Sequence, residues 1–516
     1  MIKIRQIKLS LEEDNIDTLK KKVLKKLNIK ENDLKSFEIV KKSIDARKDL
    51  KIIYEVDIET DKKIKLGKDI IETKKIDYIF PKANNTNRKI LIVGAGPAGL
   101  FCAYFLAKSG FKPTIIDRGE QVENRNKKVE EFFKTNKLDE NSNVLFGEGG
   151  AGTFSDGKLN TLIKDKRGLI KEVLKIFVSC GAPEEIMYIK NPHIGTDILK
   201  EVVKNLRNKI IEYGGTFKYN SYLEDLIIEN NTFKGAIING EKYYYDDIVL
   251  AIGHSARDTF KMLLKNKINL KNKPFAVGLR IINEQELINK NQYGEYYKLL
   301  KPASYKLTYK ASNNRGVYSF CMCPGGYVVN SSSEKGKLLI NGMSNYNREN
   351  KYANSAILVT VNNNDFGEGV LDGMYFQEEL EKKAYELGNG YIPVQLYKDY
   401  KNNKNNKLDK DYNLAFKGKY KEANLNELFP EYINSSLKEG IDYFNSLIPG
   451  LNKGLLAGVE SRSSSPVRII RDESFNSNIK NIYPAGEGSG YSGGITTSCI
   501  DGIKVAEKIV LNNSSN

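Results

Sequence analysis

Short apolar runs next to glycine-rich turns give the clearest pattern along this chain. The run 89–93 precedes the glycine-rich stretch 94–99, and an uncharged apolar segment continues to residue 107. Buried parallel strands and the helices that cover them appear as such continuous apolar runs. A second run, 113–117, ends in an acid. We therefore expect a strand, turn, helix and strand here, buried inside a protein rather than in a membrane.

The turn itself has the spacing Gly-x-Gly-x-x-Gly, which lets a backbone approach a pyrophosphate closely. Gly94 would make the tight turn, Gly96 would expose main-chain N–H groups to phosphates, and Gly99 would let the helix pack on the strand. Asp117 lies about twenty residues beyond, where an acid meets ribose hydroxyls and argues against a 2′-phosphate. The expected dinucleotide-binding residues are Gly94, Ala95, Gly96, Pro97, Ala98, Gly99, Asp117 and Arg118.

Three later glycine-bearing segments extend this prediction. They lie at 146–158, at 251–253 after a buried apolar run, and at 483–495 near the end of the chain. A simple nicotinamide dehydrogenase does not need its C-terminus to return to the nucleotide, whereas a two-domain flavoprotein does. A helix starting after 493–494 could stabilise negative charge on a reduced flavin. The further cofactor-binding candidates are Gly149, Gly150, Ala151, Gly152, Thr153, Gly253, Gly486, Glu487, Gly493, Gly494 and Ile495.

The remaining pattern divides the chain into parts. Residues 1–85 look like a small α+β module, with an alternating strand at 2–9 and a helix at 16–27. We expect an α/β fold with a discontinuous Rossmann-type FAD-binding domain at 86–262 and 478–511. A mixed α+β substrate domain, with one clear helix around 373–387, would be inserted at 263–477, and 512–516 would be a disordered tail.

Composition changes this picture little. The chain has 516 residues and a formal net charge of +16, but its lysines are scattered and accompanied by asparagine-rich patches, which argues against a nucleic-acid surface. Five cysteines and no signal peptide favour a reducing cytoplasm without disulfides. We find no metal-ligand spacing. The oligomeric state is left open.

These motifs resemble the single-Rossmann class of FAD-dependent oxidoreductases. More narrowly, the chain resembles a largely uncharacterised family of bacterial and plastid FAD-dependent dehydrogenases. Segment 278–283 departs from that family by lacking an acid–histidine pair. The resemblance implies FAD and a redox reaction, and it names no substrate. The segments that carry it are 42–47, 146–159, 192–197, 253–260, 320–326 and 460–468.

The catalytic candidates are His254, Cys321 and Cys323. His254 follows Gly253 at the edge where open α/β sheets bind ligands, and it could donate to flavin, position substrate or act as a general acid. Cys321 and Cys323 alternate on a predicted strand, so their thiols could be neighbours, as redox-active groups or as a buried apolar pair. Tentative substrate-binding residues are His193, Arg257, Arg280 and Arg462, with internal salt bridges as the alternative for the arginines.

The sequence thus favours an FAD-dependent oxidoreductase that transfers a hydride to or from flavin N5, acting on a small molecule. Only one dinucleotide fingerprint is present, so a nicotinamide, NAD(P)H, would bind transiently if at all. Two alternatives remain open. One is a flavin-dependent RNA-modifying enzyme that binds RNA through residues 1–85. The other is a non-catalytic flavoprotein or redox sensor.

Overall fold

The computed structural model describes residues 1–46, 49–405, 407–408 and 410–514. Its centre is a five-stranded, fully parallel sheet. Strands from both ends of the expected nucleotide-binding region share it, so the chain leaves this sheet and returns to it. The prediction of an α/β fold with a discontinuous Rossmann-type unit is confirmed. The strands, in spatial order, are β24 (Ile482–Pro484), β11 (Asp247–Leu250), β5 (Ile90–Val93), β6 (Thr114–Ile116) and β7 (Thr216–Lys218).

Both faces of this sheet are covered, which explains the continuous apolar runs. Ile90 and Ile92 of β5 pack into a core formed with α2 (Pro97–Lys108), α5 (Thr196–Glu212) and α12 (Ile495–Ser514). Leu91 and Val93 point the other way, into a core shared with an antiparallel three-stranded sheet. Adjacent strand residues face opposite sides, so one four-residue strand contributes to two cores. That three-stranded sheet comprises β8 (Leu223–Glu229), β9 (Thr232–Ile238) and β10 (Glu241–Tyr244).

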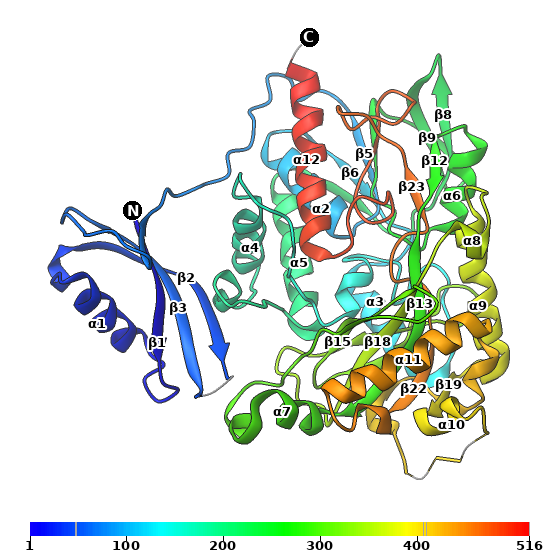
Figure 1. Ribbon diagram of the computed structural model, residues 1–516. Coiled ribbons are helices and arrows are strands. Elements are labelled where there is room, and N and C mark those ends of the chain that lie inside the picture. The colour runs from blue at the N-terminus through cyan, green and yellow to red at the C-terminus, as the bar shows by residue number, and fades with distance from the viewer. Residues whose placement is uncertain (47–48, 406, 409, 515–516) are drawn as a thin grey trace.

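The middle of the chain forms a seven-stranded sheet below the parallel sheet in Figure 1. Helix α11 (Glu431–Leu447) packs on it, and α9 (Asp372–Gly388) borders it. The sequence predicted α9 almost to its ends but missed α11. The strands, in order, are β14 (Thr308–Lys310), β15 (Gly316–Cys323), β18 (Tyr352–Val361), β13 (Phe275–Glu284), β22 (Leu455–Glu460), β19 (Ile392–Leu396) and β21 (Tyr420–Glu422).

Shorter elements connect these layers. The further helices are α3 (Val122–Thr135), α4 (Leu169–Ser179), α6 (Arg257–Lys265), α7 (Gln285–Tyr293), α8 (Asn363–Phe366) and α10 (Tyr397–Lys401). The further strands are β12 (Leu270–Asn272), β16 (Tyr327–Asn330), β17 (Ile340–Met343), β20 (Phe416–Lys417) and β23 (Val467–Ile469).

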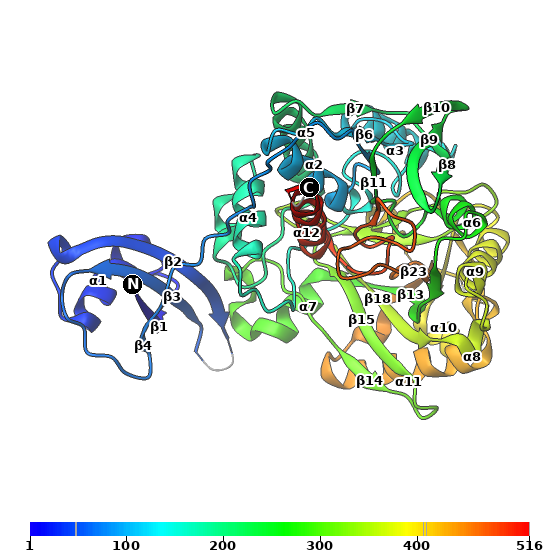
Figure 2. The same cartoon turned by 90° about the horizontal axis from the view of Figure 1, so that it is seen from above.

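The N-terminal module stands to one side of the rest (Figures 1 and 2). Its sheet has the order β2 (Leu34–Asp45), β3 (Lys51–Thr60), β1 (Ile2–Leu9), β4 (Ile70–Glu72), and α1 (Ile16–Leu27) packs on it. Strand β1 and helix α1 confirm the predicted bounds. The backbone of Lys42 exchanges hydrogen bonds with Tyr188 and Lys190, so β2 is the docking edge. Arg47, in one of the motifs above, lies outside the described residues.

The end of the chain differs from the prediction. Helix α12 continues to Ser514, so residues 512–514 of the expected disordered tail are helical, and 515–516 lie outside the described residues. Within the described residues, no helix has the length and apolar character needed to cross a membrane.

Candidate functional site

A cleft with a cavity volume of about 470 Å³ lies between the carboxyl edge of the parallel sheet and the seven-stranded sheet. The cleft brings together glycine segments that are far apart in the sequence. The predicted cofactor-binding residues that line it are Gly94, Gly96, Pro97, Ala98, Asp117, Arg118, Gly150, Ala151, Gly152, Gly253, Gly486, Glu487, Gly493, Gly494 and Ile495. Of the predicted catalytic and substrate residues, His254, Cys321 and Arg462 also line it.

The glycines allow backbone segments to approach one another at this cleft. Gly94 has φ +100°, and a Cβ there would lie 2.3 Å from the carbonyl oxygen of Ala251. A Cβ on Gly99 would lie 1.9 Å from the carbonyl oxygen of Gly94, so only glycine lets α2 pack on β5. Gly96 differs, because a Cβ there would meet nothing closer than Gly150 Cα at 3.7 Å. Gly96 therefore leaves bare backbone at the N-terminus of α2, facing the cleft.

Asp117 ends β6 and shapes the glycine turn. Its Oδ2 accepts the backbone N–H of Ala95 at 2.9 Å, and its Oδ1 accepts that of Gly119 at 2.9 Å. Each carboxylate oxygen can accept a further hydrogen bond, so the side chain can still receive ribose hydroxyls. Arg118 lines the cleft, but its charge is neutralised by a two-point ion pair with Asp258. A purely electrostatic role for Arg118 toward a nucleotide is therefore disfavoured.

Four predicted cofactor residues, Ala95, Gly99, Gly149 and Thr153, do not line the cleft, and Gly99 has the packing role described above. The N–H of Ala95 is bonded to Asp117. A Cβ on Gly149 would lie 2.0 Å from Thr153 Oγ1, and the Thr153 carbonyl accepts a bond from Thr196 Oγ1 at 2.7 Å. These residues hold the loop 149–153 against α5.

Glu487 is the acid that follows β24, and it lines the cleft. Burial raises its pKa to about 7, and Lys273 opposes the shift only partly. Near neutral pH a substantial share of this carboxyl is therefore protonated and can donate a hydrogen bond. The nearby N-terminus of α12, at 493–495, adds the positive end of a long helix dipole.

His254 also lines the cleft, and its Nδ1 lies 2.7 Å from the hydroxyl oxygen of Ser255. Burial, reinforced by the charges of Arg462 and Arg257, lowers its pKa to about 4. The imidazole is neutral at physiological pH. A hydrogen-bonding role is thus favoured over proton donation by an imidazolium, which was one of the predicted roles.

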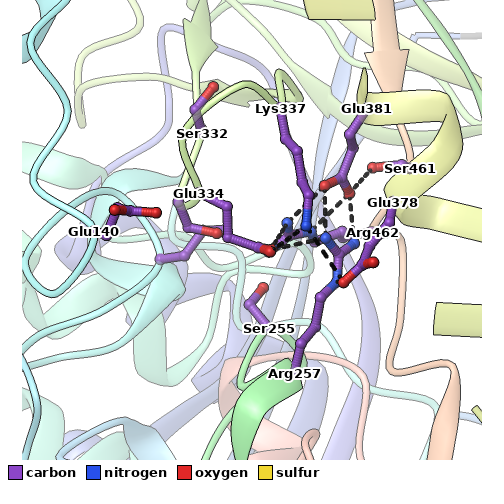
Figure 3. Close-up of polar contacts among 12 residues, drawn as sticks. Glu140, Ser255, Arg257, Ser332, Glu334, Lys337, Glu378, Glu381, Ser461 and Arg462 are labelled. Carbon is purple, nitrogen blue, oxygen red and sulfur yellow. Dashed lines mark hydrogen bonds and ion pairs between the residues drawn. The ribbon is translucent and has the colours of Figure 1, made fainter. Parts of the chain in front are cut away.

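The arginines expected to bind substrate are paired inside the protein. Arg257 and Arg462 each donate hydrogen bonds to Glu381 and to Glu334 (Figure 3). Arg280 is fully buried and bonds to Glu460 and Asn354. These pairs match the alternative of internal salt bridges, because the donors already serve carboxylates, and substrate recognition by these side chains stays a prediction. Of them, Arg462 keeps contact with the cleft.

His193 does not line the cleft. It is 4% exposed, its Nε2 lies 3.0 Å from the carbonyl oxygen of Tyr346, and its ring stacks on the Tyr346 ring. In this position it joins the loop before α5 to the loop after β17, and its expected substrate role stays a prediction.

The two predicted thiols lie at the end of the same strand but differ in solvent exposure. Cys321 is half-buried and lines the cleft, whereas Cys323 is fully buried behind it. Cys321 has φ +42°, and the pairing of β15 with β18 is interrupted between Phe320 and Cys323. The strand bulges here, so simple alternation does not describe the two side chains.

Sequence reasoning missed several charged residues of the site. Lys158 lines the cleft, pairs with Asp156 at 3.1 Å and donates to the carbonyl of Met322. Glu460 also lines the cleft, and burial raises its pKa to about 7 against the charge of Arg280. Asp156 and Lys158 lie within the glycine segment, and Glu460 ends an apolar strand. A charged residue inside a glycine-rich or apolar segment was therefore the sequence signal that could have identified them as site residues.

No cluster of three or more His, Cys, Asp or Glu side chains suited to a metal ion occurs in the part of the chain that the structure describes. The geometry fits FAD instead. Bare glycine backbone, a strand-end acid and two helix N-termini line one cleft, as binding of a dinucleotide requires.

Comparisons with known proteins agree. A family model described as "Pyridine nucleotide-disulphide oxidoreductase" matches residues 88–295, and one described as "FAD-dependent protein, C-terminal domain-like" matches residues 274–463. A domain of unknown function matches residues 1–60. An uncharacterized protein of Clostridium beijerinckii is 44% identical over 527 residues, which cover 99% of this chain and 98% of the relative.

Similar solved structures are more distant. Glycine oxidase from Bacillus cereus is 12% identical with a TM-score of 0.32, over 83% of this chain and 95% of that one. L-proline dehydrogenase from P. horikoshii is 16% identical with a TM-score of 0.33, over 84% of this chain and 94% of that one. At these values the likeness does not extend to ligands or function. From the family models and the clostridial relative, the chain belongs to a family of FAD-dependent oxidoreductases whose members include that uncharacterized protein.

Proposed function

We propose that this protein transfers a hydride between N5 of bound FAD and a small molecule held against the wall of the seven-stranded sheet. The observation that carries the proposal is the shared cleft. It is lined by glycine segments together with polar side chains from different elements, among them Lys158, His254 and Glu460. Bound FAD supplies the two-electron chemistry, and the protein supplies binding and electrostatics.

The FAD contacts that we propose follow the predicted residues. Gly96 and the N-terminus of α2 would bind the pyrophosphate, and Asp117 would accept the ribose hydroxyls. The loop 150–152 and residues 486–487 would line the path of the ribityl chain. The N-terminus of α12 would stabilise the negative charge of the reduced ring.

On the substrate side, His254 would orient the reacting molecule. When the Ser255 hydroxyl donates to Nδ1, the imidazole proton resides on Nε2, which can donate to a substrate oxygen or nitrogen. Glu460, with its pKa near 7, could hold or release a proton close to neutral pH. Lys158 keeps its charge because Asp156 raises its pKa despite burial.

The test uses the purified full chain after reconstitution with FAD. We expect a yellow protein whose bound flavin is reduced by light under anaerobic conditions and then reoxidised by at least one acceptor from a metabolite panel. NADH and NADPH are offered in parallel as donors. A colourless protein that cannot be reconstituted would overturn the proposal. A bound flavin that never cycles with any metabolite would favour a structural or sensory role.

A further inference from the structure

Two cysteines lie at the cleft, one facing it and one buried behind it. Cys321 and Cys323 end β15, and Cys321 lines the cavity that the glycine segments also line. Both are free thiols. The remaining cysteines, Cys102, Cys180 and Cys499, are buried and do not line the cleft.

A bulge in β15 takes this pair out of the regular strand alternation. Pairing with β18 stops at Phe320 and resumes at Cys323, so the intervening backbone leaves the regular strand. Cys321 adopts φ +42°, a conformation that non-glycine residues rarely adopt. The Sγ of Cys323 then donates a hydrogen bond to the carbonyl oxygen of Cys321 at 3.2 Å. Such strained positions concentrate at functional sites.

Two cations donate hydrogen bonds to the backbone of the same segment. Lys158 donates to the carbonyl of Met322, and Arg280 Nη1 donates to the carbonyl of Cys321 at 3.2 Å. The hydrogen bond from the Cys323 thiol, and then the charges of Lys158 and Arg280, lower the pKa of Cys321. The hydrogen bond to Cys321 and burial raise the pKa of Cys323. The cleft-facing thiol therefore ionises more readily than the deeper one, a difference in acidity that favours thiol–disulfide exchange.

The other cysteines show the contrast. Burial raises the pKa of Cys102, of Cys180 and of Cys499. Each is an inert, buried thiol. The packing role that a buried cysteine usually has therefore describes these three and does not account for two cations at residues 321–323.

From this arrangement we infer that Cys321 and Cys323 form a redox-active dithiol that exchanges an electron pair with the bound FAD. The inference rests on the proposed function and deepens it, because it makes the pair a second electron carrier in the same cleft. In the oxidising direction the Cys321 thiolate and the Cys323 thiol form an S–S bond. The Cys323 S–H bond breaks, and one electron pair and one proton pass to oxidised FAD. Reduced FAD returns them when the disulfide is cleaved.

The experiment counts electrons on the reconstituted full chain. The protein is treated with diamide, freed of reagent, and titrated anaerobically with dithionite while the flavin absorbance is followed. We expect the wild type to take up twice the electron equivalents per FAD of the Cys321→Ser and Cys323→Ser variants, because a disulfide is a two-electron couple. The matched control Cys180→Ala should behave as the wild type.

A mass measurement gives a readout independent of the flavin. After diamide treatment and alkylation of the unfolded chain, the peptide that carries residues 321 and 323 should be unalkylated and lighter by two hydrogen atoms than the reduced peptide. If both thiols are alkylated after diamide, or the wild type takes up no more electrons than the serine variants, the dithiol inference is wrong. A flavin that still cycles with substrate in that case leaves the proposed function intact. Failure to bind FAD would instead contradict the proposed function.

Discussion

Arg462 and Glu381 form a buried two-point ion pair, with Nε donating to Oε1 at 2.8 Å and Nη2 donating to Oε2 at 2.7 Å. Arg257 bonds to the same carboxylate from α6, as Figure 3 shows. The three side chains are between 0% and 5% exposed. One acid on α9 thus neutralises two arginines that approach it from different segments, and one of them, Arg462, lines the cleft.

We predict that Glu381→Gln destabilises the protein by about 3–5 kcal/mol, the usual loss when one partner of a buried ion pair is removed. The two guanidinium groups would then share Glu334, and Arg257 would keep the more distant Glu378. Urea unfolding measures the change. Glu379→Gln on the same helix is the matched control, since it removes only an exposed pair with Lys383 and should change stability by less than about 0.5 kcal/mol. Equal effects of the two substitutions would contradict the burial argument.

Gly96→Ala should weaken FAD binding while leaving the fold intact. The backbone of Gly96 has φ −80°, and the added Cβ would make only an ordinary contact of 3.7 Å with Gly150. The methyl group would instead occupy the space through which phosphates reach main-chain N–H groups. We expect the dissociation constant for FAD, measured by flavin fluorescence, to rise at least about tenfold, or 1.4 kcal/mol.

The control for that substitution is Gly67→Ala, because a Cβ at Gly67 meets nothing within 4 Å and the site lies in the N-terminal module. Both variants should unfold within about 1 kcal/mol of the wild type. A Gly96→Ala protein with wild-type affinity would show that phosphates do not approach this turn.

The affinity for FAD should fall as pH rises through about 7. Burial raises the pKa of Glu487 to about 7, so this carboxyl is mostly neutral at pH 6 and mostly anionic at pH 8. The FAD pyrophosphate is negative at both values, so ionisation of Glu487 adds repulsion. The dissociation constant should increase by up to about tenfold between these values, and Glu487→Gln should abolish the dependence. Glu473→Gln, at an exposed position, should retain it.

Lys158→Met should make Cys321 less reactive. The ammonium group lowers the pKa of the Cys321 thiol, so its loss leaves less thiolate at pH 7. Alkylation of Cys321 by iodoacetamide, followed by peptide mass, should slow on the order of tenfold. Lys164→Met removes an exposed lysine nearby in the sequence and should leave the rate unchanged. An unchanged rate in Lys158→Met would exclude Lys158 as the cation that activates the thiol.

The parallel-sheet unit was predictable because its signals are local. The apolar run of β5, the glycine turn and the helix α2 follow one another directly in the chain, and the alternation of β1 is equally local. Helix α11 shows the limit. Its buried positions Ile433, Leu437, Ile441 and Phe444 have helical spacing, yet Asn, Ser and Gly residues between them lower its helix propensity and obscured it.

The site was predicted unevenly for the same reason. Glycine segments could be recognised one by one, and most of their predicted residues line the cleft. The partners of the arginines could not be recognised, because Glu381 lies on a helix with no sequence relation to Arg257 or Arg462. Lys158 was missed because nothing in the sequence places its ammonium beside β15.

The sequence by itself determined the nucleotide-binding turn, the α/β class, the N-terminal module and the membership of an FAD-dependent family. These depend on residue spacing within single segments, which sets backbone conformation and burial. Only the tertiary structure decided that three arginines serve internal carboxylates, that His193 lies outside the cleft and that Cys321 faces it beside Lys158. Ion pairing, burial and pKa depend on which distant segments meet, and that follows from packing the two sheets against each other.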